Sequence, residues 1–148
     1  MQPGFTHDPE IRKLPDFDTV MVILKYSDGL ICNIDTSRIS AYGYDQRIEI
    51  FGAKGMAIAE NQKDDTVKVY TADGTDESRI KYSFPQRFQE SYLAELRNFE
   101  TAIEGDRAPS VTQEEYLISH VIADAAFESA HHGIEIKFTD FYADRVAE

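Results

Sequence analysis

The spacing of apolar residues changes at Pro85, and this change constrains the fold more than any other feature of the chain. Before Pro85, apolar and polar residues alternate in short runs, which is typical of β-strands. After Pro85, apolar residues recur every three or four positions, as they do on one face of an α-helix. A strand-rich first part followed by a helical part is the pattern of an α+β domain.

The strand-rich part predicts three β-hairpins in succession, because each pair of alternating runs is separated by turn residues such as Asp28-Gly29 and Asp73-Gly74. Successive hairpins favour a largely antiparallel sheet. The expected strand pairs are 19–26 with 30–35, 47–51 with 56–59, and 67–69 with 80–84.

The helical part predicts two main helices and one last strand. The first helix covers Phe88 to Ile103. Thr112 and Glu115 form a capping-box pattern that begins a longer helix, and a glycine at position 133 ends it. The alternating run 134–138 predicts a closing strand. The predicted fold is therefore an open, largely antiparallel sheet with two main helices on one face, which leaves the other face for water, another domain or another chain.

The length of the chain, 148 residues, predicts a single domain. Four prolines and glycines lie between Pro3 and Pro15, so we expect residues 1–16 to be a lead-in tail and 17–148 to be the domain.

The net charge of −12 argues against partners with phosphate backbones or anionic lipid surfaces, so neither nucleic acid nor a membrane is expected. No apolar run approaches the ~20 residues that a membrane-spanning helix needs. Cys32 is the only cysteine, which excludes an internal disulfide and fits a reducing compartment. These features predict a cytoplasmic protein.

Most residue types that carry chemistry lack a supporting pattern. No glycine-rich dinucleotide motif and no nucleophile elbow occur in the chain. No further ligand residue stands at metal-site spacing from His131 and His132, and their place near a helix C-terminus favours a role with the helix dipole, so no metal site is predicted. Cys32 lies among apolar strand residues and is expected to be a small buried side chain.

The best candidate for a binding surface is the segment around Gly43. Tyr42 and Tyr44 are two residues apart, so an extended chain would place both rings on one face. Arg47 and Glu49 are likewise two apart and could pair side by side. Tyrosine hydroxyls both donate and accept hydrogen bonds, which suits a hydroxyl-rich ligand. The residues alone leave two interpretations open, namely a structural sheet face and a ligand or partner surface.

Three stretches of the sequence resemble a known family. SRISAYGYDQRIEIFGAKG, followed by RFQESYLAELRNFETAIEGDRAPSVT and then GIEIKF, is similar to the C-terminal domain of the glucose–fructose oxidoreductase/inositol dehydrogenase/MocA family, and most similar to inositol 2-dehydrogenases. The similarity covers about residues 17–138.

The resemblance implies a partner and a site. Members of the family join this domain to an N-terminal Rossmann domain, bind a sugar or polyol between the two, oxidise it with NAD or NADP, and form oligomers through the free sheet face. On this basis Tyr44, with Tyr42 and Asp45 beside it, is expected at the polyol, and Tyr92 near the nicotinamide. Tyr92 also lies on the apolar stripe of its predicted helix, so core packing is a competing role.

The family's nucleotide motif and catalytic lysine precede the matched region and do not occur in this chain. No catalytic residue and no cofactor bound to this chain alone are therefore expected. The prediction is a substrate-binding and oligomerisation domain that is inactive alone. The alternative is a non-catalytic interaction module that keeps the fold. Which polyol is bound, the choice between NAD and NADP, and the subunit number stay open.

Overall fold

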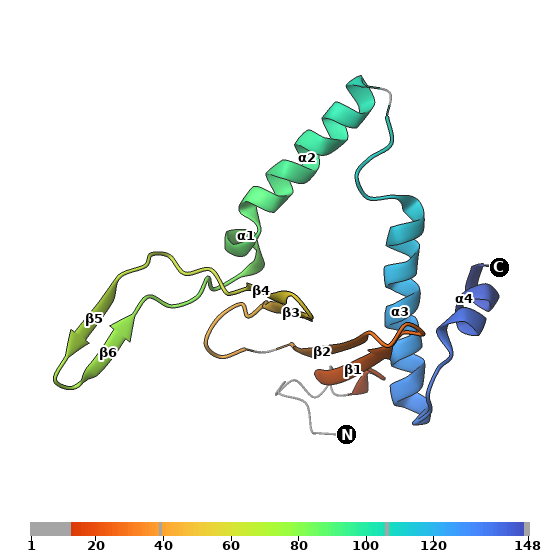
Figure 1. Ribbon diagram of the computed structural model, residues 1–148, viewed down its shortest axis with the longest axis horizontal. Coiled ribbons are helices and arrows are strands. Elements are labelled where there is room, and N and C mark those ends of the chain that lie inside the picture. Colours follow the sequence, from red (N-terminus) through yellow and green to blue (C-terminus); the bar gives the residue numbers. More distant parts are fainter. Residues whose placement is uncertain (1–12, 39, 106, 147–148) are drawn as a thin grey trace. The chain divides into compact units, whose positions relative to one another are not determined.

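The computed structural model describes residues 13–38, 40–105 and 107–146 (Figure 1). It confirms the α+β class, with three antiparallel hairpins, open sheets and two main helices. The chain divides into two compact units, Met1–Tyr92 and Leu93–Glu148, which we treat separately. The elements are β1 (Thr19–Lys25), β2 (Ile31–Ser37), β3 (Ile48–Gly52), β4 (Gly55–Ala59), β5 (Lys68–Thr71), β6 (Gly74–Glu77), α1 (Phe84–Arg87), α2 (Gln89–Glu104), α3 (Gln113–His132) and α4 (Phe138–Val146).

The first hairpin, β1–β2, forms as predicted. The Gly29 amide donates to the Tyr26 carbonyl at 3.1 Å, and Gly29 has φ +94°, a conformation that glycine adopts without steric cost. Along β1 the burial alternates, as the period of two requires. Val20, Val22 and Leu24 are half-buried, whereas Met21 and Ile23 on the other face are 65% and 60% exposed.

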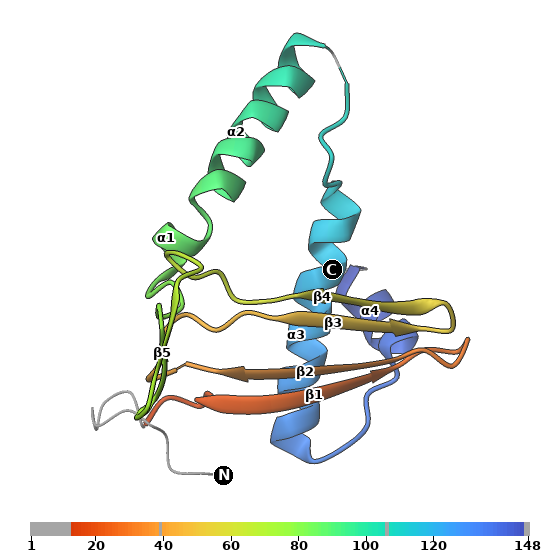
Figure 2. The same cartoon turned by 60° about the vertical axis from the view of Figure 1, so that its left-hand side comes forward.

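The second hairpin, β3–β4, also matches the prediction, with Gly52 opposite Gly55 at the turn. Figure 2 shows the antiparallel strands of β1–β2 and of β3–β4 running side by side within each hairpin. Every described strand pairs only within its own hairpin, so the expected sheet is present as three two-stranded sheets.

The third hairpin differs from the prediction in its returning strand. The predicted strand 80–84 was wrong, because β6 returns directly after a two-residue turn that places Thr71 opposite Gly74. Ile80 makes only an isolated bridge to Lys63. Phe84 begins α1 instead, and Pro85 in the first turn favours that helix because its missing N–H has no helical partner there.

The two main helices begin and end close to the predicted positions. The Thr112 hydroxyl accepts the Glu115 amide at 3.2 Å, and the Glu115 carboxylate accepts the Thr112 amide at 2.8 Å, so the capping box is present in full. Gly133 caps the C-terminus of α3 in the left-handed conformation, with φ +66°. Both signals are local, which explains why the sequence predicted them.

The predicted closing strand 134–138 was wrong. Residues 134–137 have no regular structure, and α4 begins at Phe138. A strand needs a partner for its backbone groups, and no described strand pairs with this run. The Phe138 and Tyr142 rings, four residues apart, lie 5.7 Å from each other on α4, and Lys137 bridges Asp140 at 3.2 Å.

The second unit, Leu93–Glu148, has a small core. Val121 and Ala125 on α3 and Ala102 on α2 are the buried hydrophobic residues of the described chain. By contrast, Leu96 and Phe99 on α2 are 66% and 60% exposed. No helix among the described residues is long and apolar enough to cross a membrane.

Candidate functional site

The segment around Gly43 forms a turn. The prediction that the rings of Tyr42 and Tyr44 share one face assumed that this segment is extended. The Gly43 amide donates to the Ser40 carbonyl at 3.2 Å, and Gly43 is buried with φ +136°. A Cβ atom at this position would lie 2.4 Å from Cγ1 of Ile80 and 3.1 Å from the Lys81 carbonyl oxygen. Only glycine fits here, because both the backbone conformation and the space exclude a side chain.

Backbone hydrogen bonds hold this turn against two other segments. The Tyr44 amide donates to the Lys81 carbonyl at 2.9 Å, and the Lys81 amide donates to the Gln62 carbonyl at 2.9 Å. The turn is therefore tied to both arms that lead into and out of the β5–β6 hairpin.

The Tyr44 ring rests on aromatic side chains of the helical segment that follows. Its centroid lies 6.5 Å from that of Phe84 and 5.7 Å from that of Phe88, the second in an edge-to-face arrangement at 88°. Tyr44 is half-buried, and its hydroxyl makes no hydrogen bond to another described residue. The Tyr44 ring is thus held in place by two aromatic neighbours.

Asp45 is the polar centre of the segment. Arg47 donates to it through two nitrogens, Nε to Oδ1 at 2.8 Å and Nη2 to Oδ2 at 3.1 Å. Asn61 donates Nδ2 to Oδ1 at 2.6 Å, and the Tyr42 hydroxyl donates to Oδ2. Four donors therefore converge on one carboxylate, whose side chain is only 15% exposed.

These donors favour the ionised form of Asp45. The hydrogen bond from Arg47 is the largest cause, followed by those from Tyr42 and Asn61, and together they lower the pKa of Asp45 to about 2. The same contact raises the pKa of the Arg47 guanidinium. Asp45 is consequently a carboxylate at any pH near neutrality and is unsuited to act as a general base.

The contacts of two residues in this cluster were not predicted from the sequence. Arg47 was expected to be able to pair with Glu49, but it pairs with Asp45. Asn61 lies sixteen residues from Asp45 and carries no motif; it is brought near by the β3–β4 hairpin, and its Oδ1 accepts the Gln46 amide at 2.8 Å. Only the spacing Asp-x-Arg could have pointed to the first contact.

Tyr92 lies at the end of an aromatic row within the first unit. The Phe88 ring is 6.4 Å from that of Tyr92 and 5.7 Å from that of Tyr44, so Phe88 contacts both predicted site residues. Tyr92 is 45% exposed and is therefore not a core residue in this structure. The guanidinium of Arg87 lies 5.2 Å above the Phe88 ring.

The remaining candidates have structural contacts. His132 lies 3.1 Å from the Glu128 carboxylate, one helical turn earlier, and His131 stacks on Phe127 at 4.6 Å. Cys32, which was expected to be a small buried side chain, is a half-buried free thiol. Within the described ranges, no three His, Cys, Asp or Glu side chains gather in a way that could hold a metal ion.

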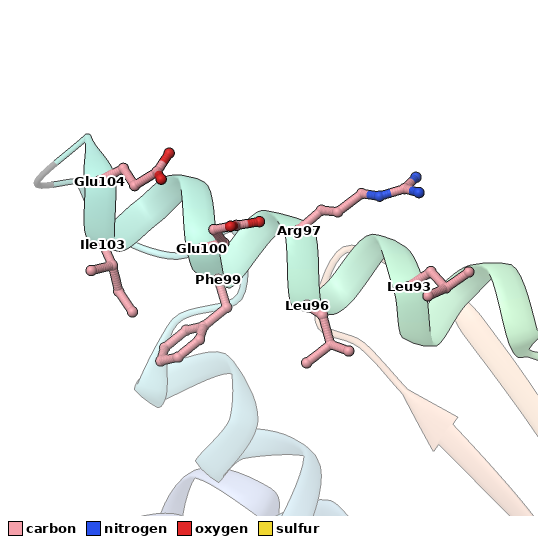
Figure 3. Close-up of a pocket in the computed structure, with 7 residues that line it drawn as sticks. All are labelled: Leu93, Leu96, Arg97, Phe99, Glu100, Ile103 and Glu104. Atoms are coloured by element: carbon pink, nitrogen blue, oxygen red, sulfur yellow. The ribbon is translucent and has the colours of Figure 1, made fainter.

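A separate shallow depression runs along α2 in the second unit. Leu96, Phe99 and Ile103 project from one side of the helix, whereas Arg97 and Glu104 project from the other (Figure 3). The lining is mostly aliphatic and aromatic, with its charges at the edge. It therefore resembles a surface that packs against protein more than one that binds a polar small molecule.

Comparison with known proteins decides the family. Residues 3–138 match the family model described as "Oxidoreductase family, C-terminal alpha/beta domain" of the glucose–fructose oxidoreductase/inositol dehydrogenase/MocA group. This chain belongs to that oxidoreductase family. The match contains every residue of the Asp45 cluster and the aromatic row, so both features lie inside the family domain.

Relatives of this oxidoreductase domain include proteins named as inositol dehydrogenases. The myo-inositol 2-dehydrogenase of Thermotoga maritima is 37% identical over 133 residues, which cover 90% of this chain and 40% of the relative. The scyllo-inositol 2-dehydrogenase (NAD(+)) of Bacillus subtilis is 26% identical over 88% of this chain and 38% of its own length. Among solved structures, a myo-inositol dehydrogenase of Corynebacterium glutamicum superposes with a TM-score of 0.79 at 37% identity, covering 88% of this chain and 40% of that one.

The oxidoreductase domain spans only about 40% of the length of the curated relatives that it matches. The relatives are thus larger proteins with additional sequence that has no counterpart in the matched region.

Proposed function

We propose that this domain is the substrate-binding and oligomerisation part of an NAD(P)-dependent dehydrogenase that oxidises inositol or a related sugar, and that it is inactive alone. The observation that supports the proposal is the Tyr42–Asp45 segment, which presents two tyrosine hydroxyls from a turn fixed by Gly43, inside a domain whose relatives are named inositol dehydrogenases.

Tyr44 is the principal substrate contact in this proposal. Its hydroxyl can both donate and accept, as each hydroxyl of a polyol can. Its ring is held by two aromatic neighbours, so little side-chain freedom is lost when a ligand binds. A positioned hydroxyl of this kind suits a ligand with many hydroxyl groups and no charge.

The described strands differ from those of a dinucleotide-binding unit. Every described strand lies in an antiparallel hairpin, whereas a nucleotide-binding unit needs parallel strands joined by a helix with a glycine-rich turn. NAD or NADP, which accepts the hydride in such a reaction, would be held by the additional part of the full-length enzyme. Tyr92, half-exposed at the end of the aromatic row, is our proposed contact for the nicotinamide end.

The exposed apolar faces of the hairpins support the proposed oligomer. Met21 and Ile23 on β1 and Ile48 and Ile50 on β3 are each more than half exposed. An antiparallel sheet with apolar side chains on its free face is stabilised when another copy covers it. Sedimentation should therefore show an oligomer, and a monomer at high concentration would contradict this part of the proposal.

The substrate contact is tested by Tyr44→Phe in the two-domain enzyme. Loss of one hydroxyl hydrogen bond should raise KM for myo-inositol or lower turnover by about tenfold. Tyr70→Phe is the matched control, because Tyr70 on β5 is 73% exposed and far along the chain from the site segment. Unchanged kinetics for Tyr44→Phe would remove Tyr44 from the site.

The second candidate function is a non-catalytic interaction module. The exposed apolar stripe on α2 favours it, because this surface fits a protein partner. The two candidates are separated by the genomic sequence upstream of Met1. A glycine-rich strand–helix unit in the same reading frame supports the enzyme, and a frame that starts at Met1 supports the module.

A further inference from the structure

We propose that Tyr42 binds the polyol as a hydrogen-bond acceptor only, and that Asp45 is a positioning residue that acts through Tyr42 without touching the substrate. This inference rests on the proposed function and deepens it. The family resemblance placed Tyr42 and Asp45 together at the polyol. In this inference only Tyr42 contacts the polyol, and Asp45 positions Tyr42.

The first step is the acceptor capacity of Asp45. An ionised carboxylate has about four lone-pair sites. Oδ1 accepts Arg47 Nε and Asn61 Nδ2, and Oδ2 accepts Arg47 Nη2 and the Tyr42 hydroxyl. The four sites are therefore used by four donors. A substrate hydroxyl could bind Asp45 only by displacing one of them.

The second step is the orientation of the Tyr42 hydroxyl. A phenol has one proton, and Tyr42 donates it to Asp45, so only its oxygen lone pairs remain for a ligand. The side chain is 62% exposed, so these lone pairs can be reached from solvent. Ionised Asp45 cannot donate a proton back to Tyr42, and the low pKa of Asp45 keeps this polarity fixed across the neutral range.

The third step is the consequence for specificity. An acceptor-only contact recognises a substrate group that donates, such as a hydroxyl. It does not recognise a ketone, an ether or a fluorine at the same ring position. A site that is built to pair with a donor discriminates against a ligand that lacks the donor, because the Tyr42 oxygen would then lose its contact with water and gain no hydrogen bond in exchange. Tyr42 would therefore face a hydroxyl that remains a hydroxyl in the product.

The test uses the full-length enzyme and a set of monodeoxyfluoro inositols, in which fluorine replaces one hydroxyl with little change in size but cannot donate. With the unmodified enzyme, KM should rise about tenfold for fluorine at the ring position that faces Tyr42. Tyr42→Phe should abolish this discrimination at that position alone. Tyr44→Phe is the control and should retain it.

A double-mutant cycle tests the indirect role of Asp45. If Asp45 acts through Tyr42, the double variant Y42F/D45N should raise KM no more than the worse single variant, with kcat less affected than KM. Additive effects would mean that Asp45 contacts the substrate directly, and would overturn the inference. Discrimination that survives in Tyr42→Phe at every ring position would also overturn it.

A separate measurement on the 148-residue chain distinguishes failure of this inference from failure of the proposed function. The same cycle, read from urea unfolding, should show a coupling between Tyr42 and Asp45 of about tenfold in the unfolding equilibrium constant. No polyol oxidation by the full-length enzyme would overturn both proposals. Oxidation without fluorine discrimination would overturn only this one.

Discussion

Gly43→Ala should be strongly destabilising, because two independent costs meet at this position. An L-residue at φ +136° is strained by roughly 1–3 kcal/mol. The new Cβ would also lie 2.4 Å from Cγ1 of Ile80, well inside contact distance, and forcing an extra methyl group into a packed site costs roughly 1–3 kcal/mol. The expected loss of unfolding free energy is therefore about 2–6 kcal/mol.

Urea unfolding, followed by circular dichroism, measures this loss. With a slope of about 2 kcal/mol/M for a chain of this size, the midpoint should fall by roughly 1–3 M. Gly74→Ala is the matched control. Gly74 has φ +144°, but no atom lies within 4 Å of the position that a Cβ would take there, so this variant carries the backbone cost alone. The difference between the two variants isolates the contact with Ile80.

A further variant, Ile80→Ala, removes the side-chain atoms that the new Cβ at position 43 would contact. The double variant G43A/I80A should therefore be less destabilised than the sum of the two single changes. Equal losses for Gly43→Ala and Gly74→Ala would refute the steric argument. Additivity in the double variant would do the same, because a shared contact cannot then account for the cost.

Two further predictions concern the carboxylate and the helix cap. The pKa of Asp45 is lower in the folded chain than its ordinary 3.8, so the stability that its ionised form contributes is present above pH 4 and is lost as pH falls toward 2. Urea unfolding at a series of pH values should show that Asp45→Asn flattens this acid dependence. An unaltered slope would argue against the four-donor cluster. Thr112→Ala removes one half of the α3 capping box and should lower the unfolding free energy by about 1 kcal/mol in the same assay. Gln113→Ala, at the next residue, is the control and should be near neutral. Equal effects of the two changes would contradict a specific role for the cap.

The features that the sequence predicted well are those set by neighbours along the chain. Asp28-Gly29 closes β1–β2, and Thr112 with Glu115 begins α3, because each uses backbone groups only a few residues away. The returning strand of the third hairpin was misplaced. The alternation of residues 80–84 suggested a strand there, but the tight turn places Thr71 opposite Gly74, so the returning strand already begins at Gly74. The run 134–138 has strand-like alternation, but a strand also needs a partner, and alternation does not supply one.

The sequence named the segment of the candidate site but did not predict the contacts within it. Tyr42, Tyr44 and Asp45 were named from one segment and a family resemblance. Asn61 was not, because its contact with Asp45 spans sixteen residues and depends on how the β3–β4 hairpin returns the chain. The division of roles that we propose for Asp45 and Tyr42 rests on the donors that surround one carboxylate, and these contacts are visible only in the structure.

The contacts at the base of the β5–β6 hairpin determine where this domain can tolerate insertions and deletions. Lys63 and Ile80 form an isolated β-bridge, and the Lys81 amide donates to the Gln62 carbonyl. These contacts hold the two arms of the hairpin together between β5–β6 and the turn around Gly43. Insertions, deletions or a grafted label between residues 64 and 79 would therefore leave the geometry beneath them intact. The hairpin is a place where the domain can acquire new surface without disturbing the turn around Gly43.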